Sequence, residues 1–107
     1  MKIKVVFNSF IIPPGYAAMT VYPYIFVSEG FISPNMLKHE LIHCQQVERV
    51  GWLYFYISYL YYFIKNYFRY RDWGYAYSNI PYEIEAYFNE DLPLTDYERG
   101  MLSNYSS

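Results

Sequence analysis

Apolar and polar residues alternate near the start of the chain, with the period of a β-strand that has one face in water. Residues 2–7 alternate lysine with isoleucine, valine and phenylalanine. A proline- and glycine-containing connection over residues 8–15 leads to a second extended run over residues 18–28. Pro23 lies in the middle of that run and has no backbone N–H to donate. We therefore expect this strand to be an edge strand or to be bulged at the proline.

Helix signals follow the two extended runs. Ser33 can cap a first helix, Pro34 suits its first position, and Gly51 is expected to end it. The next segment, from Trp52 to Phe68, consists almost wholly of aromatic and aliphatic residues.

Two shorter helices are expected near the C-terminus. One begins at Ile80-Pro81 and ends near Glu90, and a capping-box pattern at residues 95–98 starts another before the Ser- and Asn-rich tail. Strands followed by helices indicate an α+β fold, with a small N-terminal antiparallel sheet of two or three strands against three main helices. No linker or repeat divides the chain, so we expect a single domain over residues 1–107.

The aromatic segment has two interpretations. Its first thirteen residues, from Trp52 to Ile64, carry no charge, whereas a membrane-spanning helix needs roughly 20 apolar residues. One interpretation is a buried helix whose tyrosine hydroxyls find polar partners. The other is contact with a membrane surface through residues from Trp52 to Phe68, because Tyr and Trp favour the interface and Lys65, Arg69 and Arg71 suit anionic headgroups.

Charge and cysteine content exclude several classes of protein. The chain has 107 residues, a net charge of −2 and no run of clustered bases, so we expect no binding to nucleic acid. Its one cysteine, Cys44, excludes an internal disulfide framework and fits a reducing compartment. We therefore expect a cytoplasmic location, either free or at the surface of a membrane. The first ten residues are not typical of a secretory signal peptide. The oligomeric state is left open.

One pentapeptide points to chemistry. Residues 39–43 read His-Glu-Leu-Ile-His and contain both histidines of the chain. On a helix, His39 and His43 project from one face about one turn apart and can reach one metal ion. Glu40 lies at the edge of that face, where it can activate a metal-bound water. Zinc suits nitrogen ligands at such a site.

A catalytic zinc site typically has three protein ligands and a water, so a third ligand is needed. Cys44 points roughly 100° away from His43 around the helix and is better explained as a core residue. Glu83 and Glu85 begin the helix after Pro81 and face nearly opposite sides, so one of them can meet the zinc. These residues alone leave the choice between the two glutamates open.

The His-Glu-x-x-His motif followed by a helical glutamate resembles the gluzincin class of zinc metallopeptidases. In size the chain is most similar to the compact single-domain members, the minigluzincins. The chain is also similar to small bacterial proteins that pair the motif with Glu-x-Glu-Ala-Tyr. The resemblance implies a zincin-like core and a third ligand followed three residues later by a small residue. Glu83 with Ala86 has this spacing, so the ligand role falls to Glu83, with Glu85 as second choice.

The chain departs from the gluzincin pattern in two places. Many gluzincins carry an acid four residues after the third ligand, where this chain has Tyr87. The chain also has no room for the second lobe that completes the substrate cleft of larger members, and no residue is identifiable as the oxyanion donor. The strand run over residues 18–27 is expected to line a short cleft instead and to pair with an extended peptide.

The expected function is hydrolysis of a peptide or other amide bond in a peptide or protein substrate, with Glu40 as general base toward a zinc-bound water. Gln45 and Gln46 either orient groups of the site or are polar surface residues. Two alternatives stay open. One is a zinc-binding protein of the same fold without turnover, with its acidic segment over residues 91–98 lying across the cleft. The other is a membrane-surface or interaction module.

Overall fold

Three short strands form a mixed sheet in the computed structural model, which describes residues 3–10 and 17–102. The strands are β1 (Lys4–Val6), β2 (Ala18–Val21) and β3 (Tyr24–Val27), in the order β1-β3-β2. β2 and β3 are antiparallel, whereas β1 is parallel to β3. The expectation of an antiparallel sheet is therefore wrong for β1, because alternation in sequence specifies the two faces of a strand but not its partner or direction. The connection expected over residues 8–15 lies outside the described residues from residue 11 on. The Ser- and Asn-rich tail after residue 102 also lies outside them.

The extended run of the second strand is in fact a hairpin. A turn that contains Tyr22 and Pro23, with a cis peptide bond between them, separates β2 from β3. β2 is an edge strand, as expected, but β3 is the central strand of the sheet. Pro23 thus ends a strand and does not bulge one.

Helix α1 (Pro34–Val50) begins and ends where the sequence predicted. The Ser33 hydroxyl accepts a hydrogen bond from the backbone N–H of Met36, and Gly51 ends the helix with a φ of 89°. One face of α1 packs on the sheet. The core between them contains residues of β1, β3, α1 and the C-terminal end of the described chain. The buried core residues are Ile3, Val5, Ile25, Val27, Ile32, Leu37, Leu41, Cys44 and Met101.

Helix α2 (Trp52–Tyr70) follows after the single residue Gly51. Phe55 is its one buried residue, so the expectation that this segment is a buried helix is wrong, although the hydroxyls of Tyr56 and Tyr59 do find polar partners as expected. A six-residue helix, α3 (Trp73–Ser78), was not expected; the Asp72 carboxylate caps it by accepting from the N–H of Tyr75 at 2.8 Å.

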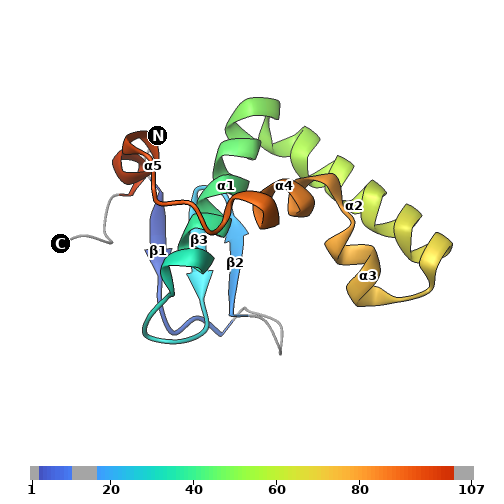
Figure 1. The fold of residues 1–107 in the computed structure, drawn as a ribbon, viewed down its shortest axis with the longest axis horizontal. Coiled ribbons are helices and arrows are strands. Elements are labelled where there is room, and N and C mark those ends of the chain that lie inside the picture. The colour runs from blue at the N-terminus through green and yellow to red at the C-terminus, as the bar shows by residue number, and fades with distance from the viewer. Residues whose placement is uncertain (1–2, 11–16, 103–107) are drawn as a thin grey trace.

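The C-terminal helices are α4 (Pro81–Asn89) and α5 (Asp96–Met101), and the predicted capping box of Thr95 and Glu98 is present. The N–H of Ile3 donates to the carbonyl of Met101, which ties the start of the described chain to α5. Figure 1 shows the sheet and α5 at one end, α1 and α4 in the middle, and α2 with α3 extending to the other end. Within the described ranges, no helix has both the length and the apolar character needed to cross a membrane.

Candidate metal centre

Three buried side chains from two helices converge between α1 and α4. Nε2 of His39 lies 2.9 Å from Oε1 of Glu83, and Nε2 of His43 lies 3.1 Å from Oε2 of the same carboxylate. The possible ligand atoms of the three residues all lie within 4.8 Å of one another. Each residue is at most 5% exposed, so the cluster is enclosed by protein on most sides.

Local sequence explains how each helix presents its part of the cluster. The four-residue spacing places both imidazoles of α1 on one side, with ring centroids 4.8 Å apart. Pro81 starts α4, which puts Glu83 in its first turn and aims that turn at α1. The two helices pack together, so residues about forty positions apart become neighbours.

The second nitrogen of each imidazole also has a fixed partner. His39 Nδ1 lies 2.8 Å from Oε1 of Glu90, and His43 Nδ1 lies 2.8 Å from Oε1 of Gln46. Both partners are acceptors, so each Nδ1 carries the proton and each Nε2 presents its lone pair toward Glu83 when the ring is neutral. This arrangement is the usual one around histidine ligands in metalloproteins.

Gln46 belongs to the site, while Gln45 does not. The Gln46 side chain is buried, and its amide donates to the carbonyl of Tyr82 at 3.0 Å and to Glu85 at 2.7 Å. The Gln45 amide donates instead to Glu98. Of the two roles considered for these glutamines, orientation of the site therefore applies to Gln46 alone.

Glu85 and Cys44 lie away from the cluster. Oε1 of Glu85 accepts hydrogen bonds from Gln46 and Arg49 of α1, and Glu85 is not one of the three residues whose ligand atoms converge. Cys44 is fully buried among core residues, and burial raises the pKa of its thiol. Of the candidate third ligands, the structure brings Glu83 to the two histidines.

The electrostatics of the cluster favour a cation between its members. Burial lowers the pKa of His43, but the adjacent Glu83 carboxylate raises it more, to about 9. Burial likewise raises the pKa of Glu83, and its contacts with the two imidazoles outweigh this effect and hold the pKa well below its usual range. An anionic carboxylate thus faces two protonatable rings, and a bound metal ion would take the place of their protons.

The spacing of the ligand atoms is near what a tetrahedral metal ion requires. Ligand atoms 2.0–2.2 Å from a tetrahedral zinc ion lie about 3.3–3.6 Å from one another. The nitrogen–oxygen distances of 2.9 and 3.1 Å are a few tenths of an ångström shorter than this spacing. His43 Nε2 makes no hydrogen bond despite its short distance to Glu83, and it is the one such buried side-chain atom among the described residues. A metal ion would satisfy that atom.

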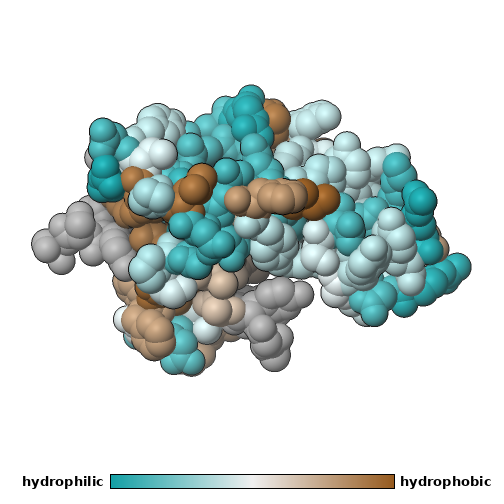
Figure 2. Space-filling model, viewed as in Figure 1, coloured by the Kyte–Doolittle hydropathy of each residue, from teal (hydrophilic) through white to brown (hydrophobic). Residues whose placement is uncertain are grey.

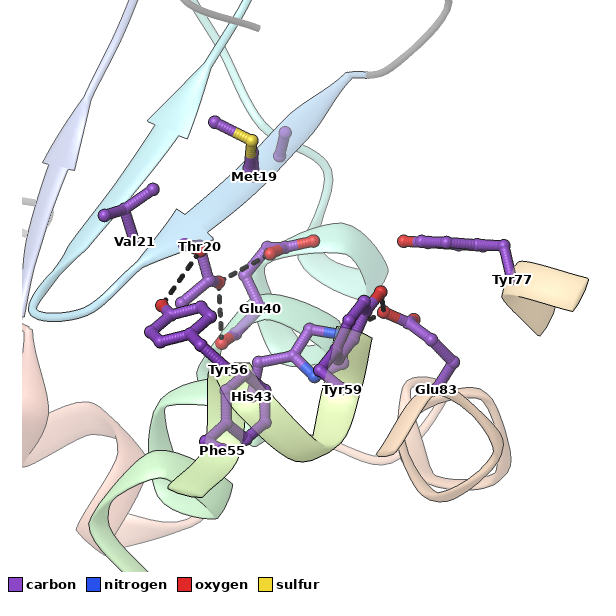
Figure 3. Close-up of a pocket in the computed structure, with 11 residues that line it drawn as sticks. Met19, Thr20, Val21, Glu40, His43, Phe55, Tyr56, Tyr59, Tyr77 and Glu83 are labelled. Atoms are coloured by element: carbon purple, nitrogen blue, oxygen red, sulfur yellow. Dashed lines mark hydrogen bonds and ion pairs between the residues drawn. The ribbon is translucent and has the colours of Figure 1, made fainter. Parts of the chain in front are cut away.

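Glu40, the expected general base, points from α1 toward strand β2. Its Oε1 atom accepts a hydrogen bond of 2.6 Å from the Thr20 hydroxyl. Figure 3 shows the Glu40 carboxylate between Thr20 and the cluster. Glu40 is 5% exposed, and the hydroxyl of Thr20 on the edge strand β2 orients its carboxylate.

A pocket of about 370 Å³ opens beside the cluster. β2 forms one wall with residues 18–21, and Glu40, His43 and Glu83 form its polar end. The rest of the wall is aromatic, and Figure 3 shows the side chains of β2, α1, α2, α3 and α4 that line the pocket. The aromatic residues are Phe55, Tyr56, Tyr59 and Tyr77.

The sequence did not predict three residues that support the site, which are Glu90, Tyr59 and Thr20. Glu90 comes seven positions after Glu83, two helical turns on, and not at the fourth position where an acid was sought. Tyr87 occupies that fourth position and places its ring 4.9 Å from that of His39. The Tyr59 hydroxyl donates to Oε2 of Glu83 at 2.6 Å, and Thr20 holds Glu40. Tyr59 and Thr20 stand among many similar residues, so no local signal distinguishes them.

The acidic segment over residues 91–98 does not cover the pocket. Asp91 accepts from Asn35, and Glu98 pairs with the buried Lys38 at 2.5 Å. None of the described residues that line the pocket comes from this segment. The segment therefore packs along α1 on the side where the helix begins.

Comparison of the chain with protein-family models, with curated protein sequences and with solved structures finds no match. The likeness to gluzincins consequently rests on the motif and on the residues around it.

Proposed function

We propose that this protein is a small zinc metallopeptidase with a zincin-like core, in which Glu40 activates water for hydrolysis of a peptide bond. The observation that carries the proposal is the convergence of His39, His43 and Glu83, each held by a second group. Glu90 and Gln46 anchor the two rings, and Tyr59 anchors the carboxylate. Such paired support is typical of metal ligands.

Each residue of the cluster then has a distinct task. Nε2 of His39, Nε2 of His43 and the Glu83 carboxylate would hold the zinc ion. Bound zinc supplies Lewis acidity, which polarises a substrate carbonyl and acidifies water. Glu40 takes the proton from the attacking water and delivers it to the leaving amine, and Thr20 keeps its carboxylate aimed at the pocket.

The edge strand supports an extended peptide as substrate. An edge strand pairs with an added strand through its outer backbone groups. On β2 the Tyr56 hydroxyl already donates to the carbonyl of Thr20 and accepts from the N–H of Tyr22. The Ala18 end of β2 is therefore where a peptide would pair, and the aromatic wall of the pocket suits an apolar side chain.

Tyr77 is the residue we assign to the developing oxyanion. In Figure 3 its ring reaches across the pocket from α3 and directs its hydroxyl inward. Burial raises the pKa of this hydroxyl, so it stays protonated as a donor.

Metal content tests the ligand assignment. We expect near one zinc per chain for the wild type by mass spectrometry, and a large loss in His39→Ala and Glu83→Gln. Glu85→Gln is the matched control, two positions away on the same helix with the same change, and should retain much more zinc than Glu83→Gln. Equal loss in the two glutamate variants would contradict the assignment of Glu83.

Cleavage of a peptide library tests the reaction. The wild type should cleave peptides and Glu40→Gln should not, although both contain zinc. Glu48→Gln, on the same helix but outside the pocket lining, is the control for the substitution itself. If the wild type and both variants contained zinc but none of them cleaved a peptide, the result would favour a zinc-binding role without turnover.

A further inference from the structure

Helix α2 carries an exposed apolar stripe along one face. Its members recur at the spacing of successive helical turns, which places them within about 100° around the helix axis. Each is between 45% and 63% exposed, far above the core residues of the sheet layer. The stripe consists of Leu53, Ile57, Leu60, Tyr61, Ile64 and Phe68.

Residues outside the stripe, on the opposite face of α2 and along one flank, make the contacts that fix the helix in the fold. Phe55 packs against Tyr82, with ring centroids 4.6 Å apart, and Asn66 donates to the carbonyl of Ala76 at 3.1 Å. Phe63 and Tyr67 both pack on Trp73. The stripe therefore points away from the rest of the molecule, and α2 does not need it for attachment.

Charge is distributed unevenly between α2 and the remainder. From Trp52 to the capping residue Arg71 there are three bases and no acid, while the rest of the chain has five bases and ten acids. The bases Lys65, Arg69 and Arg71 are exposed and lie at the end of α2. In Figure 2 hydrophilic side chains gather at that end of the molecule, where α2 meets α3.

We infer that the stripe docks on an anionic lipid bilayer, with α2 lying in the plane of the surface. An apolar face with flanking bases matches the chemistry of interfacial helices, and Tyr61 of the stripe is a residue type that favours this depth. A second copy fits less well, because α2 has no acid to meet the bases of a partner α2. This inference does not depend on the peptidase activity.

Vesicle flotation tests the inference with the full chain. The wild type should bind vesicles of phosphatidylcholine and phosphatidylglycerol in equal parts, and bind pure phosphatidylcholine far less. Leu60→Glu and, separately, Lys65→Glu should each lower the partition coefficient by about tenfold or more. Added salt should weaken wild-type binding.

Three controls separate docking from misfolding and from catalysis. Phe31→Glu puts the same charge at a residue that is 72% exposed but outside α2, and should bind as the wild type does. The circular dichroism spectrum of each variant should match that of the wild type. If Leu60→Glu loses helical signal, Ile57→Glu takes its place in the experiment. Glu40→Gln should bind vesicles normally, which keeps this result distinct from failure of the proposed activity.

Several results would overturn the inference. One is the absence of wild-type binding to the anionic vesicles at low salt, and another is equal binding by wild type and Leu60→Glu. A concentration-dependent dimer that Leu60→Glu disrupts, without vesicle binding, would assign the stripe to a second copy of the chain.

Discussion

At the level of single residues, Gln46 links the cluster to the backbone around it. Its Oε1 atom accepts from His43 Nδ1, and its amide group donates to Tyr82 and Glu85. The pentapeptide and its helix predicted both histidine positions. Only the packing of α4 on α1 shows that Gln46 faces inward while Gln45 bonds elsewhere.

We expect Gln46→Leu to weaken zinc affinity by roughly 10–100-fold, because His43 loses the acceptor that sets its tautomer. Gln46→Glu keeps the acceptor for His43 but places a carboxylate against Glu85 and the Tyr82 carbonyl, so it should recover only part of the lost affinity. Gln45→Leu is the neighbouring control, since that side chain does not contact either histidine through a hydrogen bond in the described structure. Competition with a chromophoric chelator measures all three, and an affinity loss in Gln45→Leu equal to that in Gln46→Leu would contradict the role of Gln46.

At the level of elements, Gly51 is the single residue between the two longest helices. Its φ of 89° lies in the region that side-chain-bearing residues avoid, although a Cβ there would meet no atom within 4 Å. Gly51→Ala should therefore cost about 1–2 kcal/mol through the backbone alone and lower the Tm by roughly 5–10 °C.

Gly100 provides the matched control for that substitution. It lies within α5, has open space around its Cα, and is not among the described residues with positive φ. Gly100→Ala should leave the Tm unchanged or raise it slightly, because alanine favours the helix. If both variants lowered the Tm equally, backbone strain at Gly51 would not be the cause.

Helix α5 is attached to α1 by the buried pair of Lys38 and Glu98. Burial raises the pKa of Glu98, but the hydrogen bonds from Lys38, the N–H of Thr95 and Gln45 outweigh it, so the pKa is lowered overall. A carboxyl with a lowered folded-state pKa stabilises the fold above its unfolded-state pKa of about 4.5, and this contribution is lost as the pH falls through the folded-state value.

We expect Glu98→Gln to reduce the free energy of unfolding by about 3 kcal/mol at neutral pH, because Lys38 stays buried without its partner. The difference from wild type should narrow as the pH falls below about 4.5. Urea denaturation across this pH range measures it. Asp96→Asn removes the partner of Arg99 in an exposed pair and should change stability by less than about 1 kcal/mol at any pH. A pH-independent loss in Glu98→Gln would contradict the ionic contribution.

At the level of the whole molecule, the candidate metal centre joins two helices that are separated in sequence by α2 and α3. A metal ion that binds only the folded chain stabilises it by mass action, by about 4 kcal/mol at a zinc concentration a thousand times the Kd. Chelation should therefore lower the Tm of wild type, and added zinc should restore it. His43→Ala should show little response to either treatment in differential scanning calorimetry, and an unchanged wild-type Tm after complete chelation would argue against a site that links α1 and α4.

Local sequence was sufficient for features that depend on neighbouring residues. Ser33, Pro34 and Gly51 located α1, and the Thr95–Glu98 box located α5, because caps are made within one turn of the chain. The α+β class and both histidines of the cluster were also predictable, since helical periodicity relates positions four residues apart.

Packing between distant segments decided the remaining features. The parallel pairing of β1, the exposure of α2, the meeting of Glu83 with the histidines and the support from Glu90, Tyr59 and Thr20 all depend on contacts across long sequence separations. Alternation and helical period state which face of an element is apolar, but they do not state which other element covers that face. That pairing follows from how all the elements share one core, so it emerges only in three dimensions.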